Sequence, residues 1–449
     1  MAGLFSAILR KVGFLSKSEE NEGGVPNLHP VIIPRNQHSI SRKGISEEAL
    51  KVLYRLHHNG YAAYLVGGGV RDLLLGRHPK DFDVVTDAKP EEIKSLFKNC
   101  RLIGRRFRLA HIYFGQDIVE VATFRAHHDR HGELDAATDE GMVVRDNIYG
   151  SLEEDAWRRD FTVNALYYNI ADFSLVDYTG GVQDLLDKRL RMIGEPQERF
   201  REDPIRILRA VRLSCKLGLS LDPSLISPMK DCQGFLQNVA PARLFEEMVK
   251  LFHCGAAQAA FLVLKESHIF DSLFEQTAGI VRSKEYPQDA LLDLVLSNTD
   301  LRVQSDMHVT PAFILASLLW YPMLTLSSQY IENGLPLFPA RLKASGEVFR
   351  LQSKTISIPK RLVLAVEEIW TLQLRLMRRD HKRARQLVTE PRFRAAYDFL
   401  LLRAQVEKNL QETASFWKKI VEGDESAKKS SPSKSRKFRS KKHAKPHTL

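Results

Sequence analysis

The chain has 449 residues, of which 44% are hydrophobic and 27% charged, a composition typical of a soluble protein with more than one domain. Its apolar runs are shorter than the roughly 20 residues of a membrane span and no cleavage site follows the first residues, so we predict a cytoplasmic protein without a membrane span. Its four cysteines form no CxxC pair, so we predict neither a disulfide framework nor a zinc site. The net charge of +11 lies mostly in residues 427–449, which hold nine Lys/Arg and no acid, whereas the first 426 residues carry 57 basic and 55 acidic side chains.

Residues 16–43 are polar and interrupted by glycine and proline, and we predict that residues 1–43 are a flexible leader with no core of its own. An amphipathic helix follows, because Ser46 is a good N-cap, the next residues are acidic, and leucines recur at helical spacing until Gly60 ends the pattern. This helix opens the predicted catalytic head, residues 44–196.

The most informative stretch, residues 61–87, reads YAAYLVGGGVRDLLLGRHPKDFDVVTD. It predicts an apolar strand, a glycine turn that includes Gly67 and Gly68, a short helix that carries Arg71, and a second strand. Glycines before a helix leave backbone N–H groups free to approach a triphosphate, and the helix dipole favours an anion there. The stretch therefore predicts a phosphate site, with an ordinary glycine turn as the alternative.

Asp81 and Asp83 lie two residues apart in the second predicted strand, so they point to one face while Phe82 turns into a core. Two adjacent carboxylates repel each other unless cations share them. Mg²⁺ typically binds through one or two carboxylates and substrate phosphates. The pair predicts a magnesium site beside the glycine turn, with a solvated pair of aspartates as the alternative.

Another helix and three strands, at 101–104, 109–114 and 118–124, indicate a mixed α/β domain. Glu120 lies between two valines of the last strand and projects to the face opposite them. If this strand neighbours the strand of Asp81, Glu120 is a third acidic candidate; otherwise it is a surface glutamate on an edge strand.

The segment SLEEDAWRRDFTVNALYYN begins as a capped helix and then places Arg158, Arg159, Asp160 and Asn164 within seven positions. Polar groups at this density are costly to bury without partners, and the sugar and phosphates of a nucleotide are suitable partners. A capped helix with surface arginines is the alternative. Farther on, residues 175–178 and 189–193 predict two strands around a GGVQDL turn, and the pattern after 194–196 predicts helices only.

The sequence REDPIRILRAVRLSCKLGL predicts a helix from Pro204 to Gly218 with Asp203 as its N-cap. Asp203 and Arg206 are neighbours on its first turn, and Arg209 continues their line. An acceptor beside a donor is complementary to the base edge of adenine or cytosine and not to that of guanine or uracil. The pair can therefore select ATP and CTP, and its alternative is an intrahelical salt bridge without a functional role.

Residues 197–255 form a predicted helical neck that recognises the base and binds RNA. Residues 256–425 form a predicted helical body, and its basic stretches, such as 375–386, can contact an RNA backbone. Residues 426–449 are of low complexity and predict a disordered basic tail. Its charge would attract polyanions with a strong salt dependence, although a tail that only increases solubility is the alternative.

Three ordered motifs, GGxVRDxLLGRxxKDxD, RRDFTxNAL and EDxxRxLRAxR, carry a family resemblance. They make residues 45–255 resemble the class II nucleotidyltransferases, which comprise bacterial poly(A) polymerases and CCA-adding tRNA nucleotidyltransferases. The resemblance implies an α+β fold in which a polymerase-β-like nucleotidyltransferase head with a small mixed sheet is followed by an all-helical neck and body. It also implies template-independent transfer of nucleotides to RNA 3′ ends with release of pyrophosphate.

The resemblance further implies individual roles. Asp81 and Asp83 would hold two Mg²⁺ ions, one activating the RNA 3′-hydroxyl and one bound to the triphosphate, and Asp160 would belong to the active site. Glu120 as a third metal carboxylate stays a hypothesis from the strand pattern alone. The implied positions for the phosphates, the nucleotide and the base are Gly67, Gly68, Arg71, Arg159, Asn164, Asp203 and Arg206.

Two stretches favour one branch of the family. Residues 102–112 (LIGRRFRLAHI) and 241–247 (PARLFEE) resemble elements of the poly(A) polymerase branch, and the basic tail fits that branch as well. We therefore predict a poly(A) polymerase that adds AMP from ATP to mRNA and other transcripts and marks them for decay. A CCA-adding enzyme is the first alternative, and a noncatalytic RNA-binding protein on the same fold is the second.

Overall fold

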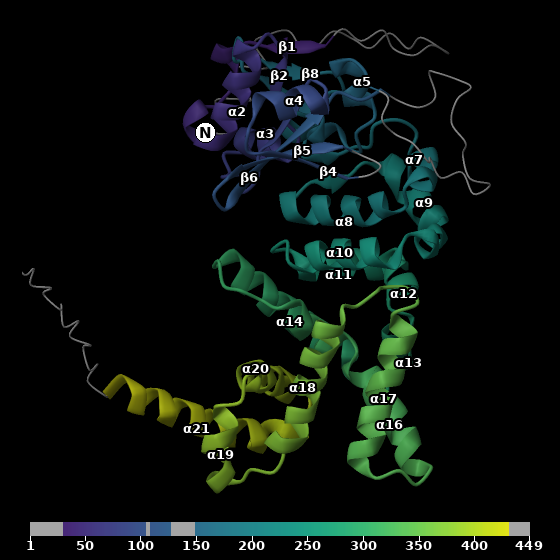
Figure 1. Cartoon of the computed structure of the whole chain (residues 1–449). Coiled ribbons are helices and arrows are strands. Elements are labelled where there is room, and N and C mark those ends of the chain that lie inside the picture. Colours follow the sequence, from purple (N-terminus) through teal and green to yellow (C-terminus); the bar gives the residue numbers. More distant parts are fainter. Residues whose placement is uncertain (1–29, 105–107, 127–148, 431–449) are drawn as a thin grey trace, which may run out of the picture. The chain divides into compact units, whose positions relative to one another are not determined.

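The computed structural model describes residues 30–104, 108–126 and 149–430 (Figure 1). The chain divides into two compact units. The first comprises Met1–Glu275, Thr299–Asp306 and Lys354–Ser357, and the second comprises Gln276–Asn298, Met307–Ser353 and Ile358–Leu449. The expected head and neck both fall in the first unit, while the expected boundaries at 196 and 255 remain predictions.

The first unit is built on a mixed eight-stranded sheet in the order β1-β8-β7-β2-β3-β6-β5-β4. The strands are β1 (Val31–Ile33), β2 (Ala63–Val66), β3 (Asp83–Thr86), β4 (Cys100–Ile103), β5 (Leu109–Phe114), β6 (Asp117–Thr123), β7 (Leu166–Asn169) and β8 (Leu175–Asp177). Only β3 and β6 run parallel; every other neighbouring pair is antiparallel. The predicted mixed sheet is confirmed, and because β3 and β6 are neighbours, the condition set for Glu120 is met.

Helix α2 (Glu47–His58) packs against β2, β3 and β6, and α4 (Pro90–Leu96) packs against β4 and β5. The Ser46 hydroxyl accepts a hydrogen bond from the Ala49 amide, as an N-cap should. The buried side of α2 carries Ala49, Val52, Leu53 and Leu56. The opposite face of the sheet packs beneath α5 (Leu152–Trp157) in a cluster formed by Val66, Val85, Phe124, Ala156, Tyr167 and Val176.

Residues 30–43 correct the expectation of a leader without a core, whereas residues 1–29 lie outside the described part. Strand β1 pairs antiparallel with β8 at the edge of the sheet, and Ile33 and Ile40 are buried. The His38 ring lies 2.9 Å from the Phe173 carbonyl oxygen and faces Tyr168 edge-on. The three residues of this strand are apolar, but the polar segment around so short a strand concealed it.

The GGVQDL segment is a helix, α6 (Gly181–Leu186), and not the turn that was predicted. The Asp177 carboxylate accepts hydrogen bonds from four successive backbone N–H groups at the start of this helix, 179 to 182. Gly181 is required because a Cβ there would lie 2.1 Å from the Thr162 carbonyl oxygen. The strand predicted at 189–193 shortens to β9 (Arg189–Leu190), and it pairs with β10 (Ser220–Leu221), so the region after 196 is not purely helical.

The neck region contains α7 (Pro196–Glu202), α8 (Ile205–Leu217), α9 (Pro223–Cys232), α10 (Pro241–Phe252), α11 (Ala257–Glu266) and α12 (Ile269–Leu273). Helix α8 packs against α10 and α11 through the apolar side that its sequence predicts, with Ile207, Leu208 and Val211 fully buried. Gly218 ends α8 in the left-handed conformation, which a glycine adopts without strain.

The remaining helices are α13 (Glu275–Ser283), α14 (Gln288–Gln304), α15 (Pro311–Leu318), α16 (Trp320–Glu332), α17 (Leu337–Gln352), α18 (Lys360–Leu376), α19 (His381–Val388), α20 (Phe393–Val406) and α21 (Gln411–Ser430). Trp320, Trp370 and Phe399 lie in the core of the second unit. Helix α21 continues to Ser430, so the first residues of the expected disordered tail are helical, and residues 431–449 lie outside the described part. Among the described helices, none is by itself long and apolar enough to cross a membrane; α15 and α16 meet that criterion only together, and they are bent by 49°.

Candidate active site

The glycine turn brings two distant segments together. Strand β2 ends at Val66, and Gly67 has a φ of +74°, a conformation that other residues adopt only with strain, before α3 (Gly68–Leu74) begins. A Cβ on Gly67 would lie 3.7 Å from Nη1 of Arg159. The turn therefore lets a guanidinium approach the backbone at the predicted phosphate site.

Arg159 is held in place by buried acceptors, and the sequence did not reveal them. Its Nε and Nη2 donate to Oδ2 of Asp155 at 3.1 and 2.8 Å, and its Nε also donates to the Tyr167 hydroxyl at 2.9 Å. Burial alone would raise the pKa of Asp155, but Arg159 and Arg158 outweigh it and the pKa is lowered. Since two of the three nitrogens of Arg159 are engaged, Nη1 is left pointing toward the glycine turn.

Arg71 lies inside the protein and not at an open surface. Its Nε and Nη2 donate to Oδ1 of Asp72 at 2.9 and 2.8 Å, and its Nη1 donates to Oδ1 of Asn164 at 2.5 Å. The charge that was expected to face phosphate thus joins α3 to the short 3-10 helix Thr162–Asn164.

The carboxylates Asp81, Asp83 and Glu120 gather at the edge of β3 and β6. Asp83 opens the strand β3 and pairs with Glu120 of β6, while Asp81 precedes the strand. The Asp83 side chain is open to solvent on one side and crowded by protein on the others. Desolvation, followed by repulsion from Glu120 and Asp81 and opposed by attraction to Arg159, raises the pKa of Asp83 to about 6.

This donor set suits a divalent cation. Among the described residues no three His, Cys, Asp or Glu side chains are arranged to hold a metal by themselves. Mg²⁺ usually binds through one or two carboxylates and completes its shell with water and substrate phosphates, so two carboxylates beside a phosphate site are sufficient. The repulsion that raises the Asp83 pKa is the interaction that a bound cation would relieve.

Among the described residues, the hydrogen-bond partners of Asp160 are N–H donors within the first unit. Its Oδ2 accepts hydrogen bonds from Nε (2.7 Å) and Nη2 of Arg209, and its Oδ1 accepts from the Asn164 amide group at 3.2 Å and the Phe161 backbone N–H at 2.8 Å. Burial would raise the pKa of Asp160, but the ion pair with Arg209 and these hydrogen bonds lower it. Arg209 is therefore a central partner of this site. The sequence predicted only that it lies on the same side of its helix as Arg206.

Asp203 and Arg206 differ from their expected arrangement. Asp203 follows α7 and caps nothing with its side chain; its Oδ2 accepts from Nη2 of Arg243 at 2.9 Å. Nη1 of Arg206 donates to Glu202 and to the Arg199 carbonyl oxygen, both at 2.7 Å. The intrahelical salt bridge that served as the alternative is thus absent from the described contacts of this pair, and each side chain pairs with another residue.

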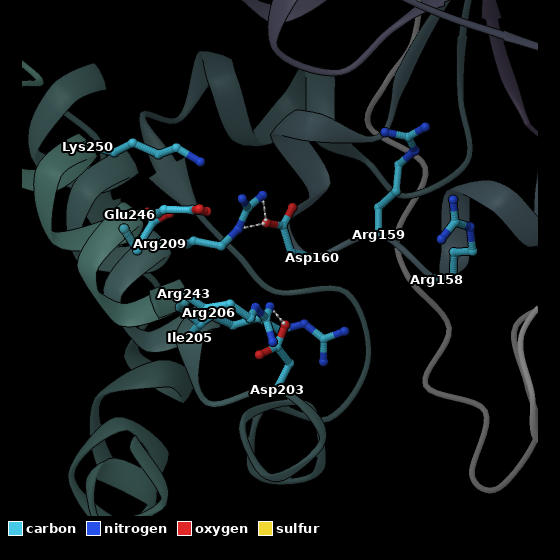
Figure 2. A pocket seen from close by; sticks show the side chains of 11 residues that line it. Arg158, Arg159, Asp160, Asp203, Ile205, Arg206, Arg209, Arg243, Glu246 and Lys250 are labelled. Carbon is cyan, nitrogen blue, oxygen red and sulfur yellow. Dashed lines mark hydrogen bonds and ion pairs between the residues drawn. The ribbon is translucent and has the colours of Figure 1, made fainter. Parts of the chain in front are cut away.

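A cavity of about 360 Å³ gathers many of these side chains in the first unit (Figure 2). Its size is within the range of small-ligand sites. Basic side chains outnumber acidic ones along its wall, which favours an anionic ligand. The lining residues are Arg158, Arg159, Asp160, Asp203, Ile205, Arg206, Arg209, Arg243, Glu246, Glu247 and Lys250.

Known protein families match most of the chain. Family models match at residues 63–191, described as the poly(A) polymerase head domain, at 218–280, described as the probable RNA- and SrmB-binding site of polymerase A, and at 333–448, described as the polymerase A arginine-rich C-terminus. The chain is 50% identical over 417 residues to poly(A) polymerase I of Salmonella typhimurium, covering 91% of this chain and 89% of that protein. The chain belongs to the bacterial poly(A) polymerase family.

More distant members of the superfamily share part of the chain or the fold. A CCA-adding enzyme of Lactobacillus helveticus is 34% identical over 241 residues, which cover 54% of this chain and 58% of that enzyme. The crystal structure of the Bacillus stearothermophilus CCA-adding enzyme in complex with CTP matches with a TM-score of 0.55 and 25% identity over 82% of each chain. The predicted family and the polymerase-β-like head followed by helices are confirmed.

Proposed function

We propose that this chain is a template-independent poly(A) polymerase that adds AMP from ATP to RNA 3′ ends. The observation that carries the proposal is the 50% identity to poly(A) polymerase I along nearly the whole of both chains, whereas the CCA-adding relative matches little more than half of each. The 3′-hydroxyl of the RNA would lose its proton to water and its oxygen would bond to the α-phosphorus, while the bond from that phosphorus to the oxygen that bridges to the β-phosphorus breaks and pyrophosphate leaves.

Asp81 and Asp83 would hold two Mg²⁺ ions. When bound, these ions would make the RNA 3′-hydroxyl more acidic and neutralise charge on the triphosphate. The raised pKa of Asp83 supports this assignment, because its carboxylate is desolvated and repelled by its acidic neighbours. Glu120, opposite Asp83 in the strand pairing, is the third carboxylate of the proposed site.

Arg159 is the phosphate-binding residue that the contacts favour most. Asp155 and Tyr167 fix its orientation, and its remaining Nη1 lies 3.7 Å from the place of a Cβ on Gly67, at the start of the turn. Arg71 and Asn164 would act behind this surface, since their mutual hydrogen bond already occupies one donor and one acceptor.

Asp203 and Arg206 would read the base from the cavity wall. Oδ1 of Asp203 and Nη2 of Arg206 have no partner among the described residues, so an acceptor and a donor are left for a base edge. Asp160 would hold the helix of Arg206 in place through Arg209. A cytoplasmic location and a role in marking transcripts for decay belong to the same proposal and rest on the family alone.

The test is extension of a generic RNA by the purified protein with Mg²⁺ and each nucleoside triphosphate in turn. Long tails from ATP alone are expected. Addition limited to C, C and A on tRNA that lacks its 3′ end would favour a CCA-adding enzyme instead. Asp81→Ala serves as the catalytic control: extension that persists in this variant would refute the metal assignment, and no extension by the unaltered protein would favour a noncatalytic RNA-binding protein.

A further inference from the structure

One polar row crosses four neighbouring strands of the head sheet. Asp83 of β3 lies opposite Glu120 of β6, and Glu120 lies opposite His111 of β5. His111 in turn lies opposite Arg101 of β4. Residues directly opposite each other in adjacent strands project to the same face, so two carboxylates, an imidazole and a guanidinium follow one another across it.

The neighbouring row turns to the other face of the sheet, whereas the face of Asp83 also carries Val66, Val85 and Tyr167 of the cluster under α5. Val84, Val121 and Ala110 occupy the next positions of the same strands, project to the opposite face, and are buried. By contrast, the His111 and Glu120 side chains are 19% and 50% exposed. Their row therefore lies where a ligand can reach the carboxylates.

Glu120 has one polar contact among the described side chains. Nε2 of His111 lies 3.4 Å from Oε1 of Glu120. A half-exposed glutamate that lacked this contact would sample several rotamers, and the like charge of Asp83 directly opposite in the strand pairing would favour those that turn away from the metal site. The contact comes from the β5 side, whereas Asp83 lies on the β3 side.

We propose that His111 is a positioning residue, which engages one oxygen of Glu120 so that the other faces Asp83 and the two carboxylates can share a divalent cation. The inference rests on the proposed metal site and adds a residue to it. Groups that orient metal ligands without touching the metal commonly change metal affinity by 10- to 100-fold when they are replaced. Removal of an exposed ion pair with no such role would leave the metal affinity almost unchanged, so a positioning role and an incidental contact predict different dissociation constants.

The experiment is titration of the full-length protein with Mn²⁺, followed by electron paramagnetic resonance in the presence of a nonhydrolysable ATP analogue. His111→Leu keeps the volume and removes the polar group that contacts Glu120, and we expect the Mn²⁺ dissociation constant to rise about 10-fold. His111→Gln keeps a polar group at this position and should stay within about threefold of the unaltered protein. Tyr113→Phe, two residues along the same strand with its ring 6.4 Å from His111, is the matched control and should bind Mn²⁺ normally.

The same titration separates this inference from the proposed function. If Asp83→Asn binds Mn²⁺ as tightly as the unaltered protein, the metal site itself is misplaced. If Asp83→Asn loses binding while His111→Leu retains it, only the role of His111 is overturned. The role is also overturned if His111→Leu raises the KM for RNA with the Mn²⁺ affinity unchanged, because His111 would then contact RNA. Thermal unfolding of each variant checks that the fold persists, and the partial rescue by His111→Gln would not accompany a general loss of structure.

Discussion

Arg209→Met removes the guanidinium that neutralises Asp160 while keeping most of the aliphatic volume of the side chain. In the native protein Nε and Nη2 of Arg209 donate to one oxygen of Asp160 and thereby join helix α8 to the segment that follows α5. The side chain of Asp160 is 10% exposed. The variant therefore leaves a desolvated carboxylate whose remaining donors among the described residues are the Asn164 amide group and the Phe161 N–H.

The expected loss lies between two limits. Removing one partner of a fully buried ion pair costs about 3 to 5 kcal/mol, whereas an exposed pair contributes about 0 to 1 kcal/mol. The Arg209 side chain is 35% exposed, so water screens part of the interaction and can reach part of the space it leaves. We expect Arg209→Met to lower the free energy of unfolding of the first unit by about 2 to 3 kcal/mol at pH 7.

The loss should depend on pH with a defined sign. The folded-state pKa of Asp160 is lowered, so its contribution to stability is complete above the unfolded pKa of about 3.9 and disappears as the pH falls through the lower folded value. Without Arg209, burial is the main remaining influence and raises the pKa, so the variant gains stability relative to its value at pH 7 when acid protonates Asp160. The difference between the two proteins should therefore shrink as the pH falls from 7 toward 4.

Native-state hydrogen exchange in increasing urea measures this difference within the first unit. The Phe161 amide is the natural probe because it donates to Asp160. Arg189→Met is the control, since Arg189 forms a 3.6 Å pair with Asp222 at 48% exposure, and it should cost less than about 1 kcal/mol. A loss for Arg209→Met below about 0.5 kcal/mol, or one that is constant between pH 7 and 4, would refute the reasoning.

Three further predictions concern other parts of the chain. Asp83→Asn should abolish nucleotide addition. In the metal-free native protein, the free energy of unfolding should fall by at most about 1 kcal/mol as the pH rises through 6, because the group is exposed, and the variant should not show this loss. A native protein whose urea midpoint is the same at pH 5 and pH 7 would contradict this. Gly181→Ala should destabilise the first unit by about 2 to 4 kcal/mol in urea unfolding because its Cβ would overlap the Thr162 carbonyl, whereas Gly234→Ala, with open space around it, should be nearly neutral; equal effects would disprove the clash. Deleting residues 427–449, with nine Lys/Arg, should weaken RNA binding and flatten its dependence on salt in a filter-binding assay, and an unchanged salt slope would argue that the tail makes no contact with phosphates.

Local patterns predicted the elements that carry the site. The strand containing Leu65 and the glycine turn are signalled by residues near in sequence, because strand period, glycine conformation and helix capping act over a few positions. The strand predicted to carry both aspartates begins only at Asp83, so Asp81 precedes it. The same patterns missed β1, whose three residues pair only because β8 presents a free edge, and they read α6 as a turn because the carboxylate that starts this helix, Asp177, belongs to the preceding strand.

Partners far apart in the chain could not be predicted in this way. Asp155 looked like one of several acidic residues in a first helical turn, yet it is the buried acceptor that orients Arg159. Arg209 lies 49 residues from Asp160, and Arg243 lies 40 residues from Asp203. No spacing rule along one helix or strand identifies such pairs, since each depends on how two elements pack.

The sequence by itself determined the reaction class of this protein through the family resemblance of its three ordered motifs, while the glycine turn and the paired aspartates predicted a phosphate and metal site from local patterns. Only the tertiary structure decided how those groups are held: Arg71 and Asp160 prove to be occupied by internal partners, whereas Glu120 comes to lie beside Asp83 with His111 behind it. The physical reason is that a side chain's identity sets which bonds it can form, while the packing of distant strands and helices sets which of those bonds remain available to a ligand.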